Sequence, residues 1–232
     1  MSLMRILLFP ISILYCLFQL IRNKFYDLSL LKSQEFNIPT VSVGNLSVGG
    51  SGKTPLVNYI ISTFKKDYKI AFLSRGYART TSGYILASES NNVYEIGDEP
   101  YLIKKNHKEI TVVVSEKRDI GIEKTLEKID DIQMFVLDDA FQHRSLKCSL
   151  NIVLSKFSSP YYNDFVIPTG NLREPKSGIK RAQIIIISKC PDDLDINKRK
   201  EIIKKINPLS YQNVFFTSID YDDIIKGQNK IK

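Results

Sequence analysis

A glycine-rich segment that ends in a lysine and a threonine is the part of the sequence best suited to chemistry. Residues 43–54 read VGNLSVGGSGKT. The glycines let backbone N–H groups curl around phosphates, Lys53 can reach the β- and γ-phosphates of a nucleotide, and Thr54 offers a hydroxyl to Mg²⁺. Ser47 stands where the usual pattern has its first glycine. A strand predicted before the segment and a helix after it favour a phosphate-binding loop over a glycine-rich turn without a ligand.

An acidic pair ends another predicted strand. Residues 134–139 read MFVLDD, an apolar run followed by Asp138 and Asp139. Proteins with a phosphate loop need a carboxylate at the end of a neighbouring strand to hold the metal shell. We expect one aspartate to organise Mg²⁺ and its water, and the other to order Lys53 or the attacking group. Such a pair is common in solvated turns, so its meaning depends on the phosphate loop.

Arginines also follow two predicted strands, in the segments SRGYAR (74–79) and SEKR (115–118), and Arg173 of NLREP (171–175) sits in a predicted loop. Ligands of open parallel sheets bind in the crevice where the strands end. A single arginine is typical of a solvated surface, whereas this shared placement predicts that several face one anionic site. The segment SKCP (188–191) follows another strand, at a position where some proteins with a phosphate loop hold the nucleotide base.

Brief apolar runs rich in β-branched residues predict the strands that position these groups. The runs do not alternate strictly, which is typical of strands buried on both faces of a parallel sheet. The expected strands span residues 38–43, 69–74, 110–115, 133–137, 151–154, 184–188 and 214–219, and the expected helices include 55–65, 120–129 and 197–206. We therefore predict an α/β fold with a P-loop NTPase-like, mostly parallel sheet flanked by helices.

The N-terminus carries an almost wholly apolar run at residues 6–21, ILLFPISILYCLFQLI, with Arg5 before it and Arg22 and Lys24 after it. The run is shorter than the roughly 20 residues that a spanning helix needs, and no small residues mark a signal-peptide cleavage site. The flanking cations are typical of a helix held at an anionic membrane face. A membrane-associated helix is therefore favoured, with a buried core helix as the alternative.

The composition sets wider limits. The chain has 232 residues, 43% of them hydrophobic, and a formal net charge of +8, which suggests an anionic partner. It has three cysteines and two histidines, too few for a disulfide framework or a Cys/His zinc site. The charge could indicate a nucleic-acid-binding protein, but no aromatic-interleaved basic stripe or nucleic-acid motif is present, so we expect no nucleic-acid partner.

Five blocks of sequence together resemble the tetraacyldisaccharide 4′-kinase family, also called the lipid A 4′-kinases. They are VGNLSVGGSGKTP (43–55), LSRGYAR (73–79), GDEP (97–100), LDDAFQHR (137–144) and LREP (172–175). The resemblance implies transfer of the γ-phosphoryl of ATP to the 4′-hydroxyl of a tetraacyldisaccharide 1-phosphate, which forms the 1,4′-bisphosphate of lipid A biosynthesis. It also implies a place at the cytoplasmic face of the bacterial inner membrane, with the lipid A disaccharide precursor and the membrane surface as partners.

The same resemblance assigns roles to individual residues. It implies that ATP binds to Ser47, Val48, Gly49, Gly50, Ser51, Gly52, Lys53 and Thr54. Asp98 resembles the family's base for the sugar hydroxyl, with Lys53 and Asp139 as further catalytic groups, and Thr54, Glu99 and Asp138 are expected at Mg²⁺. Arg75, Arg118, Gln142, His143 and Arg173 are expected to face the substrate.

The chain also departs from the family pattern. Family members continue past the strand expected at 214–219, and a histidine from that later region is expected to support the base, whereas the last histidine here is His143. We expect a membrane-associated helical segment at residues 1–32 and a kinase domain at 33–232 that lacks part of its C-terminal lobe. The alternative function is a P-loop module that binds nucleotide for assembly or regulation without catalysing lipid phosphorylation.

Overall fold

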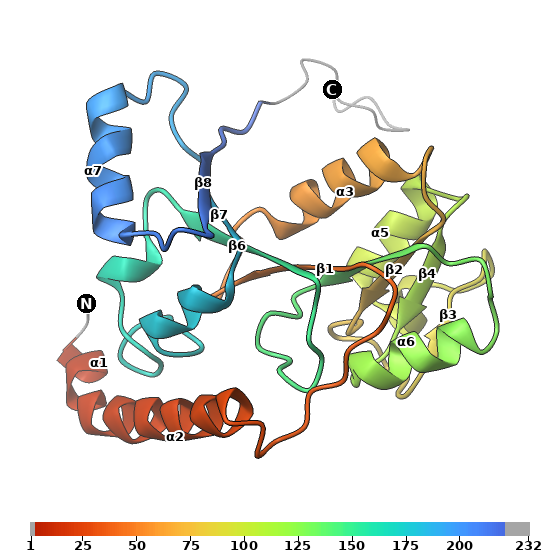
Figure 1. Ribbon diagram of the computed structural model, residues 1–232, viewed down its shortest axis with the longest axis horizontal. Helices are drawn as coiled ribbons and strands as arrows, with labels where there is room; N and C mark the ends of the chain where they lie inside the picture. Colours follow the sequence, from red (N-terminus) through yellow and green to blue (C-terminus); the bar gives the residue numbers. More distant parts are fainter. Residues whose placement is uncertain (1–2, 221–232) are drawn as a thin grey trace, which may run out of the picture.

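The computed structural model describes residues 3–220 and has a β-sheet at its centre (Figure 1). The strands are β1 (Thr40–Asn45), β2 (Ile70–Ser74), β3 (Ile85–Leu86), β4 (Thr111–Val114), β5 (Met134–Asp138), β6 (Leu150–Lys156), β7 (Ile184–Ser188) and β8 (Asn213–Phe216). Their order across the sheet is β3-β4-β2-β5-β1-β6-β7-β8, and only the β3–β4 pair is antiparallel among the described strands. The predicted mostly parallel sheet is confirmed.

Helices pack on both faces of this sheet (Figure 1). They are α3 (Lys53–Phe64), α4 (Val93–Ile96), α5 (Asp98–Asn106), α6 (Arg118–Leu126) and α7 (Ile196–Ile206), with short 3₁₀ helices η1 (Tyr161–Asn163) and η2 (Lys176–Arg181). Alternate strand residues face opposite layers: Phe72 and Val136 pack in the core beneath α3 and α5, whereas Leu73 and Leu137 pack in the core beneath α6. This two-sided burial explains why the strand sequences do not alternate between apolar and polar residues.

The sequence prediction missed the short elements between β2 and β4. β3 is only two residues long, which is too short for a periodic signal. α4 begins with a capping box, in which the Asn92 side chain accepts hydrogen bonds from Tyr94 and Glu95 and Glu95 bonds back to Asn92. α5 follows after Gly97, whose φ of 90° suits glycine and turns the chain so that Asp98 begins the next helix.

The N-terminus forms α1 (Leu3–Leu7) and α2 (Phe9–Asp27), and α2 lies along the outside of the molecule (Figure 1). Pro10 lies in the first turn of α2, where a proline ring does not interrupt helical hydrogen bonds. No described helix is both long enough and apolar enough to cross a membrane. The boundary at residue 32 stays a prediction.

Candidate active site

The glycine-rich segment forms a loop between the end of β1 and the start of α3. Gly49 and Gly52 have φ values of 101° and 91°, a left-handed conformation that glycine adopts without steric cost. α3 begins at Lys53, two residues earlier than predicted, and its N-terminus follows the loop directly. Unpaired N–H groups at a helix N-terminus favour a bound anion. The local structure is therefore that of a phosphate-binding loop.

A cavity of about 460 Å³ opens beside this loop, at the carboxyl ends of the strands. Its lining comes from segments that are far apart in the sequence: Gly49, Gly50, Lys53, Ser74, Arg75, Tyr77, Asp98, Glu99, Arg118, Asp138, Asp139 and Arg173. The cavity thus collects the lysine of the loop, three arginines and four carboxylates. This composition suits a multiply charged anion together with a cation.

Three oxygen-bearing side chains meet at one side of the cavity. The Thr54 hydroxyl donates a hydrogen bond to Glu99 Oε1 at 3.0 Å, and the carboxyl of Glu99 also lies beside that of Asp138. Asp138 is 3% exposed, and its Oδ1 atom has no hydrogen-bond partner. Burial and the neighbouring Glu99 carboxyl raise the pKa of Asp138 well above its ordinary value. A cation bound between these oxygens would stabilise the ionised carboxylate of Asp138.

This donor set was tested against the needs of Mg²⁺. Within residues 3–220 no group of three His, Cys, Asp or Glu side chains is arranged around one point as a complete metal cage. Mg²⁺, however, is usually held by one or two carboxylates together with substrate phosphates and water. Thr54, Glu99 and Asp138 therefore fit Mg²⁺ that arrives with a nucleotide.

Asp139 joins the phosphate loop to the arginine-bearing segment. Its Oδ1 lies 3.6 Å from Lys53 Nζ, and its Oδ2 accepts a hydrogen bond from Arg173 NH1 at 2.7 Å. The backbone of Asp139 has a φ of 47°, in the left-handed region that few residues other than glycine adopt. This turn directs the side chain away from that of Asp138. The two aspartates therefore contact different partners.

Arg118 is a buried cation of the cavity wall. It is 3% exposed, its NH1 donates to the carbonyl of Ser115 at 2.9 Å, and its Nε has no hydrogen-bond partner. Burial lowers the pKa of Arg118 to about 10, and the carboxylates of Asp138 and Asp139 oppose that shift. The guanidinium therefore stays charged at neutral pH and can offer an N–H group to an anion in the cavity.

Asp98 and Arg75 lie at the more open side. Asp98 is exposed at the first turn of α5, and its only side-chain contact in the described chain is Oδ1 accepting the Glu99 amide at 2.9 Å. Arg75 is exposed directly after β2. An exposed carboxylate on the cavity wall is free to accept a proton from a hydroxyl that enters from solvent.

Comparison with known proteins agrees with this geometry. The profile of the family described as tetraacyldisaccharide-1-P 4′-kinase matches residues 4–222. The chain belongs to this family. Its tetraacyldisaccharide 4′-kinase relatives include those of Flavobacterium johnsoniae, 44% identical over 99% of this chain and 68% of the relative, and Bacteroides fragilis, 42% identical over 94% and 58%. LpxK from Aquifex aeolicus, solved in complex with ATP, is 33% identical with a TM-score of 0.75, covering 99% of this chain and 87% of that one.

Against this family background, the predicted site residues separate into three groups. Most lie together in the cavity, whereas Ser47, Val48 and Ser51 line another cavity of about 230 Å³ at the phosphate loop. The third group lines neither cavity and consists of Gly52, Thr54, Gln142 and His143. Thr54 bonds Glu99 of the cavity wall, and Gln142 and His143 also have protein partners. Gln142 Nε2 donates to the Asn45 carbonyl at 2.8 Å and to Glu174 Oε1 at 3.1 Å.

His143 lies behind Arg118. Its Nε2 atom accepts a hydrogen bond from the Arg118 amide at 3.2 Å and is 3.0 Å from Ser145 Oγ. In the described chain, Gln142 and His143 thus contact residues that form the walls of the site, and their side chains do not line its cavity. Contact of either side chain with substrate stays a prediction.

Sequence analysis missed two residues of the site. Tyr77 is 78% exposed and lines the cavity between Arg75 and the strand ends. Its position in the SRGYAR segment was the available signal, since the same loop carries Arg75. Asn45, at the end of β1, accepts a hydrogen bond from Lys53 Nζ at 3.5 Å. It lies within the glycine-rich segment at 43–54, in which only the glycines, Lys53 and Thr54 were given chemical roles.

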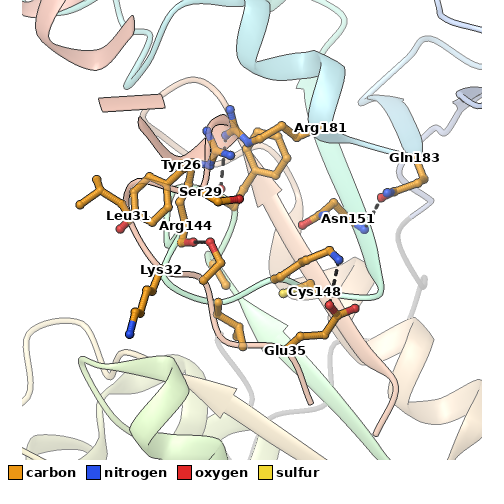
Figure 2. A pocket seen from close by; sticks show the side chains of 15 residues that line it. Tyr26, Ser29, Leu31, Lys32, Glu35, Arg144, Cys148, Asn151, Arg181 and Gln183 are labelled. Carbon is orange, nitrogen blue, oxygen red and sulfur yellow. Dashed lines mark hydrogen bonds and ion pairs between the residues drawn. The ribbon is translucent and has the colours of Figure 1, made fainter. Parts of the chain in front are cut away.

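A second, larger cavity of about 710 Å³ lies beneath the end of α2, away from the phosphate loop (Figure 2). Its walls include the solvent-exposed Lys32 and three further cations, Arg144, Lys147 and Arg181, each of which has an acidic partner. Arg144 pairs with Asp27, Lys147 with Glu35 and Arg181 with Glu174, each at 2.8 Å. Size alone would favour this cavity as the site, whereas unmet charge favours the smaller one.

Proposed function

We propose that the chain is an ATP-dependent tetraacyldisaccharide 4′-kinase, which transfers the γ-phosphoryl of ATP to the 4′-hydroxyl of a tetraacyldisaccharide 1-phosphate. The observation that carries this proposal is the cavity that joins the phosphate loop to Asp98, Glu99 and three arginines. Phosphoryl transfer needs positioning and charge neutralisation more than covalent chemistry. The family relationship supplies the substrate class, since the relatives bear that name.

The chain's own residues account for each part of the transfer. Lys53 binds the β- and γ-phosphates, while Arg118 and Arg173 neutralise charge on the transferred group. The Asp98 carboxylate takes the proton of the 4′-hydroxyl as the new O–P bond forms. The bond between the γ-phosphorus and its bridging oxygen breaks with its electron pair on ADP. Arg75 and Tyr77 face the acceptor at the open side of the cavity.

The metal belongs to the nucleotide side of this site. Bound Mg²⁺ would neutralise negative charge on the β- and γ-phosphates. Thr54, Glu99 and Asp138 would hold it, because their oxygens meet where Asp138 Oδ1 has no partner. Asp139 instead keeps Lys53 and Arg173 in place.

The alternative function, nucleotide binding for assembly or regulation, explains the phosphate loop equally well. It leaves Asp98 without a role. Asp98 is exposed on the cavity wall and pairs with no cation in the described chain, as a base that must reach an external hydroxyl should. Asp98 therefore favours the kinase.

We further propose that α2 lies in the anionic face of a membrane. Its outward side is apolar, with Leu14 68% exposed, Phe18 61% and Ile21 55%, while its buried residue is the polar Ser12. This pattern is the reverse of a surface helix in a water-soluble protein. A continuous exposed apolar face with nearby Arg22 and Lys24 is typical of an interfacial helix. The substrate's acyl chains would lie in the same membrane.

The function is tested by supplying ATP and tetraacyldisaccharide 1-phosphate in mixed micelles and analysing the lipid by mass spectrometry. We expect the lipid to gain the mass of one phosphate, placed at the 4′ position by fragmentation. The Lys53→Ala variant, with its fold checked by circular dichroism, is the matched control and should give almost no product. Nucleotide binding without any product from the folded wild-type chain would support the assembly or regulatory module.

The membrane proposal has its own test, flotation with vesicles that contain anionic phospholipid. A double variant, Leu14→Ser with Phe18→Ser, should float much less than the wild type. Leu102→Ser changes a half-exposed leucine on α5 and is the matched control. Equal flotation of all three chains would contradict a membrane role for α2.

A further inference from the structure

The inward side of α2 combines apolar contacts, made by Tyr15 and Cys16, with hydrogen bonds to the segment that delivers Arg173 to the active site. Ser12 is 4% exposed, its hydroxyl donates to Thr169 Oγ1 at 2.8 Å, and it accepts from the Thr169 amide at 3.0 Å. One turn further along α2, the Tyr15 hydroxyl donates to the carbonyl of Arg173 at 2.9 Å. A third contact joins Asn23 Nδ2 to Glu174 Oε2 at 3.4 Å. Hydrogen bonds thus attach α2 to residues 169–174 at three positions along the helix.

The same segment is bonded to the start of the phosphate loop. The Val48 amide donates to the Asn171 carbonyl at 2.8 Å, and the Arg173 amide donates to the Leu46 carbonyl at 2.7 Å. Ser47 and Leu172 form an antiparallel bridge between these two contacts. Residues 171–173 are therefore paired with residues 46–48 as a short ladder, and the Arg173 guanidinium reaches Asp139 from it.

We propose that α2 positions the Arg173 guanidinium through this ladder, with Tyr15 and Ser12 as the positioning residues. The helix then has two separate roles on two faces: the outward apolar face meets the membrane, and the inward face holds Arg173. The inference rests on the proposed kinase function only where it predicts a change in kcat. The physical coupling between Tyr15 and the ladder does not depend on which reaction is catalysed.

The placement of polar groups supports coupling rather than simple docking. A helix that only needed to attach would bury apolar side chains, because burial of apolar area is the larger and less directional gain. α2 buries apolar surface at Tyr15 and Cys16, but it also places hydrogen bonds from side chains at residues 12, 15 and 23, each to residues 169–174. Hydrogen bonds fix direction and distance, which a catalytic arginine requires.

Tyr15→Phe removes the hydroxyl and keeps the ring, and Tyr26→Phe makes the same change further along α2, where the structure shows no hydrogen bond from the hydroxyl. In the full chain in micelles, with both substrates saturating, we expect Tyr15→Phe to lower kcat about threefold to tenfold, because the hydrogen bond to the Arg173 carbonyl is lost. The variant also removes the hydrogen bond that the hydroxyl accepts from Gln19 Nε2 within α2. Tyr26→Phe should keep the wild-type kcat. Flotation with anionic vesicles should be the same for all three chains.

The test of mechanism is a double variant. In an Arg173→Ala background, where the guanidinium is already absent, Tyr15→Phe should lower kcat little further. If the fold-loss of kcat in the double variant equals the product of the fold-losses of the two single variants, the proposal is overturned. An unchanged kcat in Tyr15→Phe alone would overturn it as well. Ser12→Ala, which breaks the contact with Thr169, should show the same dependence on Arg173.

A second readout is independent of activity. Amide hydrogen exchange at Val48 and Arg173 reports the ladder itself, and we expect it to be faster in Tyr15→Phe than in the wild type or Tyr26→Phe. Unchanged exchange at both amides would overturn the proposal even if kcat fell. If the wild-type chain formed no phosphorylated lipid, the proposed function would be contradicted, while the exchange result would still decide whether Tyr15 holds the ladder.

Discussion

The cavity beneath α2 and the cavity beside the phosphate loop differ in how their charges are matched. In the larger one, beneath α2, Arg144, Lys147 and Arg181 each bond a carboxylate at 2.8 Å. In the smaller one, beside the phosphate loop, Asp138 Oδ1 and Arg118 Nε are buried without partners. Buried polar atoms are almost always paired in folded proteins, so unpaired ones mark a place where something else binds.

Unmet buried charge therefore identifies the functional cavity better than volume does. The ion pairs of Arg144 with Asp27 and of Lys147 with Glu35 hold the end of α2 and the loop at residues 28–36 to the body of the protein. The charges beside the phosphate loop are arranged for a partner that is not part of the chain.

Asp98→Asn should have the largest effect on catalysis. The amide keeps the shape of the side chain but cannot take the hydroxyl proton, so kcat should fall by about 10²–10⁴, the contribution of a positioned base. ATP affinity, measured by calorimetry, should stay near the wild-type value, because Asp98 lies outside the phosphate loop. Asp131→Asn changes an exposed carboxylate far from the cavity and serves as the control. Parallel loss of ATP binding would show that Asp98 is a nucleotide or metal ligand.

A matched pair of lysines compares the two cavities directly. Lys53 and Lys147 each lie beside one carboxylate, at 3.6 Å and 2.8 Å. We expect Lys53→Ala to lower kcat by about 10²–10³, since its ammonium acts on the charge of the transition state. Lys147→Ala should leave kcat unchanged within twofold, because the exposed pair contributes at most about 1 kcal/mol to stability. Similar losses in both variants would contradict the assignment of the smaller cavity.

The sequence predicted the parts of this site that lie in continuous motifs. Each of these motifs, the loop at 43–54 and the pair Asp138–Asp139, follows an apolar run that predicts a strand. The residues after the run have a defined chemistry, so the strand and the groups at its end could be predicted together. Asp98 and Glu99 came only from the family resemblance, because α4 has only four residues and the apolar residues of α5 lie together at 101–103 instead of at helical spacing. The different partners of Asp138 and Asp139 could not be predicted, since they depend on the left-handed backbone at Asp139.

The N-terminal helix shows a second limit of sequence reasoning. Its apolar run correctly indicated a helix, and the run alone could not decide which face is covered. The polar positions Ser12, Tyr15 and Asn23 share one face, but their partners lie about 150 residues away in sequence. Only the fold brings that segment beside the helix.

Arg144→Ala should change stability rather than chemistry. NH1 of Arg144 donates to the carbonyl of Asn23 and NH2 donates to Asp27, both at 2.8 Å, so the end of α2 depends on this side chain. We expect the free energy of unfolding to fall by about 1–3 kcal/mol, as for a lost charge-assisted hydrogen bond. Urea unfolding provides the measurement, and kcat per folded chain in micelles is the second readout. A large loss of kcat at unchanged stability would show that the larger cavity takes part in catalysis.

The smallest expected effect concerns the pH dependence of stability. It arises from His107, which lines neither of the two cavities. Burial, with a smaller contribution from the nearby Lys65 ammonium, lowers the pKa of His107. Below the ordinary histidine pKa of about 6.5, the unfolded chain therefore binds a proton more readily than the folded chain, and stability falls. His107→Gln removes this contribution, so its free energy of unfolding should fall less between about pH 7.5 and about pH 5.5 than that of the wild type. Equal slopes would contradict the assigned direction of the pKa shift.

The central claim is that the cavity with unmet charge, and not the larger one, receives the nucleotide. Amide hydrogen exchange of the full chain, with and without ATP and Mg²⁺, tests it without relying on turnover. We predict slower exchange at residues 47–55 and around Asp138 and Asp139 when ATP is present, and no change at residues 28–36 or 144–148. Protection confined to the segments beneath α2, with none in the phosphate loop, would contradict the account.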